Sequence, residues 1–124
     1  MTRWWWVIAL AILASCTTPA ASPIDAAFRL SPARPVVGPL HVEVTLSERG
    51  TPVLGADVEL EATMSHAGMV PIFARMQELG DGRYAAEIDL TMAGDWILIT
   101  RARLPDGRQV EHHFDVRGVQ PHTP

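Results

Sequence analysis

Apolar and polar residues alternate with a period of two in several separate segments of this chain. That pattern limits the fold more than any other feature. It runs through residues 40–46, 56–62, 84–90 and 110–116. Successive side chains of a strand point to opposite faces, so each segment predicts a strand with one buried face and one wet face. No 3.6-residue period that would indicate an amphipathic helix persists over a useful length of the same region.

Turn sequences separate these segments and set the fold class. Residues 48–52, 80–82 and 105–107 combine Gly with Pro, Asp or Arg, which is typical of tight turns. Residues 96–104 predict a central strand, and residues 27–30 and 72–78 predict two weaker strands. About seven short strands at regular spacing predict an all-β fold, an immunoglobulin-like antiparallel β-sandwich. Without a Cys pair, Trp96 and Phe114 are expected to fill its core.

The first sixteen residues predict export and lipid attachment. One Arg precedes an apolar run over residues 4–14, which is too short for a membrane-spanning helix of roughly 20 residues but fits a signal peptide. Residues 13–16 (Leu-Ala-Ser-Cys) resemble a bacterial lipobox, which places a lipid on Cys16. A plain signal peptide and an uncleaved anchor are the alternatives. The expected organisation is a signal peptide over 1–15, a lipidated tether over 16–24, the sandwich over 25–118 and a disordered tail over 119–124.

Charge and cysteine content exclude several classes of protein. All ten basic residues are Arg and the net charge is −4, so the chain has no basic surface for nucleic acid. A single Cys excludes an internal disulfide and a Cys-rich zinc site. The expected location is the cell envelope outside the cytoplasm, on the periplasmic side in a Gram-negative cell, with the membrane as one partner through Cys16.

Three motifs in order resemble the YtkA-like and FixH-like family of exported domains. They are Gly-Thr-Pro-Val-Leu-Gly-Ala-Asp-Val-Glu-Leu at 50–60, Gly-Arg-Tyr-Ala-Ala-Glu-Ile-Asp-Leu at 82–90 and Thr-Met-Ala-Gly-Asp-Trp-Ile-Leu at 91–98. The resemblance covers residues 40–116. It implies an extracytoplasmic β-sandwich tethered to a membrane, and for some members a link to copper supply for respiratory oxidases. Family members commonly carry a Met-Pro-x-Met cluster, whereas this chain has Met64-Ser-His66-Ala-Gly-Met69 with Pro71 beyond it.

Residues 64–69 are the one group that predicts metal chemistry. Thioether sulfur is a soft ligand suited to Cu(I), and imidazole also binds copper. Met64 and His66 lie two residues apart and would face one side of an extended segment. Gly68 permits a turn that brings Met69 back towards them. These three residues are the predicted Cu(I) ligands, and Met76 and Met92 are candidates for joining them from neighbouring strands.

Packing is the competing interpretation of the same residues. Met64 continues the inward phase of residues 56–62, and methionine fills irregular gaps in a core. His112 predicts a hydrogen-bonded core or rim residue, and His41 and His113 predict solvated positions. Glu59 and Glu61 share a strand face, where a solvated pair is favoured over a catalytic one.

No recognised catalytic motif occurs, so an enzyme is not expected. The predicted function is a membrane-tethered accessory domain that delivers Cu(I) to a respiratory or efflux partner. The alternative is a metal-free module that scaffolds a membrane protein complex.

Overall fold

The structure is a computed structural model that describes residues 23–66 and 68–123. The predicted signal peptide, Cys16 and the tether up to residue 22 lie outside these residues. In the described part no helix is long and apolar enough to cross a membrane. The strands are β1 (Ile24–Ser31), β2 (Gly38–Glu48), β3 (Thr51–Pro52), β4 (Asp57–Thr63), β5 (Ile72–Arg75), β6 (Gln77–Gly80), β7 (Arg83–Leu90), β8 (Gly94–Arg103) and β9 (Gln109–Val119).

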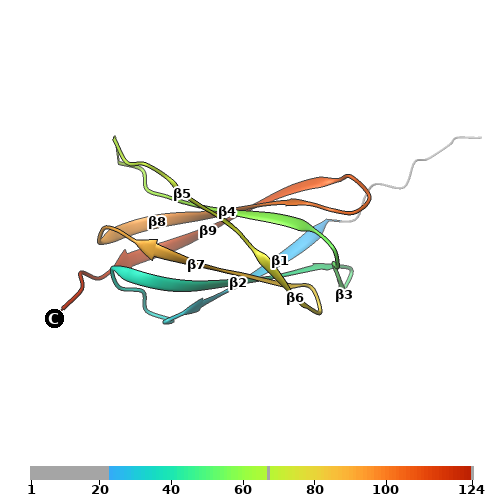
Figure 1. Ribbon diagram of the computed structural model, residues 1–124, viewed down its shortest axis with the longest axis horizontal. Coiled ribbons are helices and arrows are strands. Elements are labelled where there is room, and N and C mark those ends of the chain that lie inside the picture. Colours follow the sequence, from blue (N-terminus) through green and yellow to red (C-terminus); the bar gives the residue numbers. More distant parts are fainter. Residues whose placement is uncertain (1–22, 67, 124) are drawn as a thin grey trace, which may run out of the picture.

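Two antiparallel sheets face each other as the two layers of a sandwich (Figure 1). One sheet has the order β1-β2-β7-β6, with β3 paired to β2. The other has the order β5-β4-β8-β9. The predicted all-β antiparallel sandwich is therefore confirmed.

The inward positions of the alternating segments form the core between the sheets. Val58, Leu60 and Leu98 are at most 1% exposed, whereas the intervening residues of β4 and β8 face outward. Trp96 fills the core as predicted, with 1% of its surface exposed. Phe114 is only half-buried and stacks on Phe28 of β1, with ring centroids 4.9 Å apart. The prediction that Phe114 shares the central core with Trp96 is therefore wrong, because its ring lies at the margin between β1 and β9.

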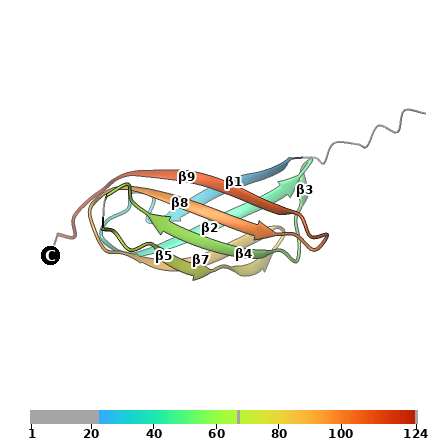
Figure 2. The ribbon, with the colours of Figure 1, turned by 90° about the horizontal axis from the view of Figure 1, so that it is seen from above.

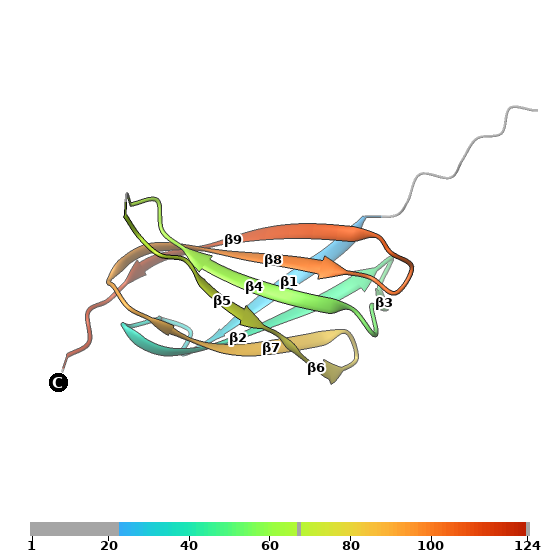
Figure 3. The same cartoon turned by 45° about the horizontal axis from the view of Figure 1, so that its top comes forward.

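The predicted strand over residues 72–78 is two strands that belong to different sheets. β5 pairs with β4, and β6 pairs with β7. Between them the Met76 amide donates a hydrogen bond to the Val58 carbonyl at 2.9 Å, while its side chain is buried. The chain therefore crosses from one sheet to the other at Met76 (Figure 3).

The end of β9 and the residue after it pack against the rest of the sandwich. β9 continues to Val119, which is 2% exposed, and the Gln120 carbonyl accepts a hydrogen bond from the Val37 amide at 2.8 Å. Every strand pair and the whole buried core lie within residues 24–120. This segment therefore contains all of the packing that holds the described fold together.

The sandwich has two unlike ends. β1 begins at one end, together with the turns that join β6 to β7 and β8 to β9 (Figures 2 and 3). The loop between β4 and β5 and the turn between β7 and β8 lie at the opposite end. We call the second end the methionine end, because Met64, Met69 and Met92 lie on these two connections.

Candidate functional site

Met64 links the two connections of the methionine end. It follows the last residue of β4 and is 5% exposed, so it belongs to the core, as the packing interpretation predicts. A Cβ atom added to Gly94 would lie 3.1 Å from the Met64 methyl carbon. The Met64 side chain therefore reaches across to the start of β8, directly after the β7–β8 turn.

The β4–β5 loop turns back on itself as the sequence predicts. Gly68 has a φ of +82°, and the Met69 amide donates a 3.4 Å hydrogen bond to the His66 carbonyl. Met69 is half-buried and packs against the core, whereas the His66 side chain is exposed. The loop thus holds one buried thioether, one half-buried thioether and one solvent-facing imidazole.

Of the two additional methionines, only Met92 lies at this end. It is 45% exposed on the β7–β8 turn, and its carbonyl accepts a 2.9 Å hydrogen bond from the Trp96 indole. Met76 lies opposite Val58, which precedes Met64 by six residues along the chain through β4. At about 3.3 Å per residue that separation is roughly 20 Å, so Met76 does not lie with the other three.

The donors at the methionine end are soft ones. No group of three or more His, Cys, Asp or Glu side chains that could hold a metal ion occurs among the described residues. Hard cations such as Ca²⁺ and Mg²⁺ need oxygen ligands, whereas Cu(I) prefers thioether and thiolate sulfur. The side chains gathered here therefore suit Cu(I) better than a hard cation.

Three other histidines, all in strands, occupy structural or surface positions. The His112 Nε2–H donates to the Ile24 carbonyl at 2.7 Å, which confirms a hydrogen-bonded rim residue and ties β9 to the start of β1. His113 is exposed and contacts Glu111 at 2.6 Å. The His41 side chain is 41% exposed. None of the three lies on the two connections of the methionine end.

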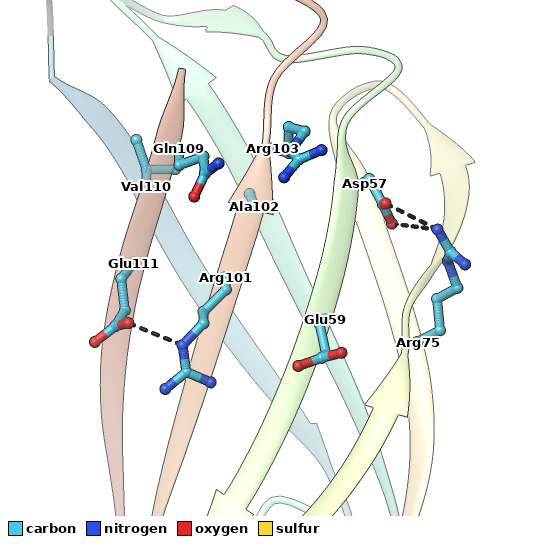
Figure 4. A pocket seen from close by; sticks show the side chains of 9 residues that line it. All are labelled: Asp57, Glu59, Arg75, Arg101, Ala102, Arg103, Gln109, Val110 and Glu111. Atoms are coloured by element: carbon cyan, nitrogen blue, oxygen red, sulfur yellow. Dashed lines mark hydrogen bonds and ion pairs between the residues drawn. The ribbon is translucent and has the colours of Figure 1, made fainter. Parts of the chain in front are cut away.

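A second feature is a charged hollow on the outer face of the β5-β4-β8-β9 sheet (Figure 4). Its volume is about 570 Å³, and Asp57, Arg75 and Arg103 are among the residues that line it. Arg75 binds both Asp57 carboxylate oxygens at 2.8 Å. The sequence interpretation did not identify this hollow, although the outward positions of β4 and β8 carry opposite charges along the sequence.

Arg101 is the centre of an ion-pair network beside the hollow. Its guanidinium binds Glu61 at 2.6 Å and Glu111 at 2.9 Å. The hydrogen bond that Arg101 donates to Glu61 raises the pKa of Arg101, and the bonds that Glu111 accepts from His113 and then from Arg101 lower the pKa of Glu111. Glu61 is therefore an ion-pair partner whose side chain is only 14% exposed, so the prediction of a solvated residue is wrong for Glu61, whereas Glu59 is exposed as predicted.

The fold and the methionine end define a small β-sandwich domain with thioether donors gathered at one end. The YtkA-like family model matches residues 20–101, so the chain belongs to the YtkA-like family. Comparison with curated proteins finds no match. The FixH-like resemblance and the lipid on Cys16 stay predictions.

Solved structures share the fold at low sequence identity. CopC from Methylosinus trichosporium is 14% identical with a TM-score of 0.53, over 81% of this chain and 98% of that one. The soluble domain of PmoD from a Methylocystis species is 11% identical with a TM-score of 0.51, over 77% and 90%. A cycloalternan-degrading enzyme from Trueperella pyogenes is 18% identical with a TM-score of 0.54, over 71% of this chain. This chain spans only 11% of that enzyme, so the likeness concerns the fold and not the activity.

Proposed function

We propose that this domain binds Cu(I) at the methionine end and passes it to a membrane partner by ligand exchange. The observation that supports the proposal is the place of Met64, Met69 and Met92 on the two connections at this end, where the Met64 methyl group lies beside Gly94 and His66 lies on the same loop as Met69. Two or three thioethers and one imidazole form a low-coordinate set that favours Cu(I) over harder ions.

The different exposures of the donors suit transfer rather than storage. Met64 is buried in the core, Met69 is half-buried and packs against the core, and His66 and Met92 are exposed to solvent. A partner can replace the exposed donors one at a time while the buried thioether still holds the ion. Ligand exchange of this kind needs no catalytic residue, so we do not propose an enzyme.

The position of the site supports a tethered arrangement. β1 begins at the end of the sandwich opposite the methionine end (Figure 2). A lipid on Cys16 would hold the domain by the end at which β1 begins. The copper donors would then lie about 35 Å away along strands of the length of β2, accessible to a partner outside the cytoplasm.

Conservative methionine variants separate copper binding from packing. Met→Leu keeps the volume of the side chain and removes the sulfur, so a packing role tolerates it. We expect residues 23–124 to take one equivalent of Cu(I) from a chromophoric chelator. The combined variant Met64→Leu, His66→Ala and Met69→Leu should lose at least about tenfold in affinity.

Met76→Leu is the matched control, because it removes a buried sulfur at a distance from the site. It should leave Cu(I) affinity unchanged, and Met92→Leu should weaken it. If the native domain fails to compete with the chelator, or if the combined variant competes as well as the native domain, the copper proposal is wrong.

The exposed apolar residues at the same end favour the second candidate, a metal-free interaction module. Val70, next to Met69, is 78% exposed. Phe73, the second residue of β5, is 58% exposed. Exposed apolar side chains gathered at one place are typical of protein contacts. A membrane partner that the lipidated protein retains after exhaustive chelation would support this function over copper delivery.

A further inference from the structure

Around the hollow, the outer face of the β5-β4-β8-β9 sheet carries charges whose sign alternates from strand to strand. Side chains at alternate positions of a strand share one face, and the inward positions of these strands are the buried ones. Around the hollow the outward charges are positive on β5, negative on β4, positive on β8 and negative on β9, whereas Asp95 on β8 and Asp115 and Arg117 on β9 lie towards the methionine end. The residues are Arg75 on β5, Asp57, Glu59 and Glu61 on β4, Arg101 and Arg103 on β8, and Glu111 on β9.

Two of these charges have no partner among the residues that the structure describes. Arg75 pairs with Asp57, and Arg101 pairs with Glu61 and Glu111. Glu59 and Arg103 make no hydrogen bond or ion pair with any residue that the structure describes, and both line the hollow (Figure 4). The face therefore holds one free carboxylate and one free guanidinium on adjacent strands.

A second copy of the chain is the partner that this pattern fits. We propose that two copies pack face to face through this sheet, related by a two-fold axis that runs parallel to the strands between β4 and β8. Such an axis places β4 over β8 of the second copy, and β5 over β9, so every strand meets one of opposite charge. An axis across the strands would instead place each strand over itself and oppose like charges.

The observed strand register gives the contacts. Asp57 and Arg103 are register partners on β4 and β8, so each comes to face the other residue of the second copy. Glu59 faces the partner's Arg101 by the same rule, which gives the free carboxylate a cation. Phe73, which is 58% exposed on this face, comes to lie over the partner's His113 and adds apolar area. The hollow leaves room for the long Arg103 side chains to cross the interface.

The direction of the axis also agrees with attachment to one membrane. A two-fold axis parallel to the strands leaves the start of β1 at the same end in both copies. Two lipids on Cys16, a feature that rests on the predicted tether, would then enter one bilayer. The methionine ends would both point away from it and stay free.

The size of the face predicts a weak dimer. Four strands about 4.8 Å apart and roughly seven residues long cover about 450 Å² in projection, against about 800 Å² per partner in a standard interface. We expect residues 23–124 to show a monomer–dimer equilibrium at roughly 100 µM by sedimentation equilibrium. Because charges drive it, association should weaken as salt shortens the Debye length from about 10 Å to about 3 Å.

Charge reversal tests the orientation of the two copies. Asp57→Arg puts a cation opposite Arg103 of the other copy, at both of the symmetry-related contacts in the dimer. Arg103→Asp likewise puts an anion opposite Asp57 of the other copy at both contacts. Each single variant should lose at least about tenfold in association. An equimolar mixture of the two variants restores both ion pairs in a heterodimer, so it should associate as the native chain does. Arg29→Asp, an exposed reversal on β1 in the other sheet, is the matched control and should not change association.

The mixture distinguishes contacts between copies from effects within one copy. Mixing leaves the surroundings of residue 57 or 103 within its own chain unchanged, so only a contact across the interface explains recovery. Circular dichroism of each variant confirms that it is folded. A native chain that stays monomeric to millimolar concentration overturns the proposal. So do single variants that still dimerise, or a mixture that does not recover.

Discussion

Gly82→Ala is expected to lower the free energy of unfolding by about 3–5 kcal/mol, an effect of the size seen for severe overpacking combined with backbone strain. Gly82 lies in the turn between β6 and β7 with a φ of +76°. A Cβ atom there would lie 2.6 Å from the Leu46 carbonyl oxygen and 3.1 Å from the Pro52 Cβ. Both neighbours are fixed, because the Leu46 amide donates to the Gly82 carbonyl and β3 pairs with β2. The turn, β2 and β3 therefore all have to shift.

Gly50 supplies a matched control for this variant. Its φ is +77°, and no atom lies within 4 Å of a Cβ added to it. Gly50→Ala should therefore cost only the left-handed backbone penalty of roughly 1–2 kcal/mol. The difference between the two variants in urea denaturation measures the collision alone. Equal losses at Gly50 and Gly82 would show that the contact with Leu46 does not constrain the turn.

The strands were predictable because a sandwich imposes a local pattern on the sequence. Residues 40–46, 56–62, 84–90 and 110–116 all lie within β2, β4, β7 and β9, apart from Ala56, which precedes β4. Each of these strands has one face on the core, so the period of two follows directly from burial. Strand order was not predictable, because it depends on which distant segments pack together.

The division at Met76 shows the same limit. Residues 72–78 read as one alternating run, and Met76 is buried as an inward residue should be. The change of partner from β4 to β7 depends on a backbone hydrogen bond between Met76 and Val58, which no sequence pattern specifies. For the same reason Met76 could not be separated from Met92 as a neighbour of Met64 before the structure was known.

The candidate sites differ in how far apart in the sequence their residues lie. The turn at Gly68 is encoded within six residues, so the return of Met69 was predictable from residue type. The network of Arg101 with Glu61 joins residues that are 40 positions apart. Its geometry follows from the pairing of β4 with β8, and the alternating charges of that face become visible only once the strands are placed side by side.

Trp96→Ala is expected to destabilise the domain by about 3–5 kcal/mol, the usual cost of removing a large buried aromatic side chain. Among the residues that the structure describes, Trp96 is the largest fully buried one, with 1% of its surface exposed between the two sheets. Its indole also donates to the Met92 carbonyl at 2.9 Å, which holds the β7–β8 turn against the core. The variant therefore removes packing and releases the turn that carries Met92.

Two further variants divide these contributions. Trp96→Phe keeps an aromatic ring in the core but loses the bond to Met92, so it should cost about 1–2 kcal/mol for the hydrogen bond and increase amide exchange in the β7–β8 turn. Phe114→Ala removes a half-buried ring that stacks on Phe28 at the edge of the sandwich, and it should cost less than Trp96→Ala. Urea denaturation measures the free energy of unfolding of all three variants, and an unchanged m-value shows that the change is one of stability. A Phe114→Ala loss as large as that of Trp96→Ala would mean that the margin between β1 and β9 contributes as much to stability as the central core.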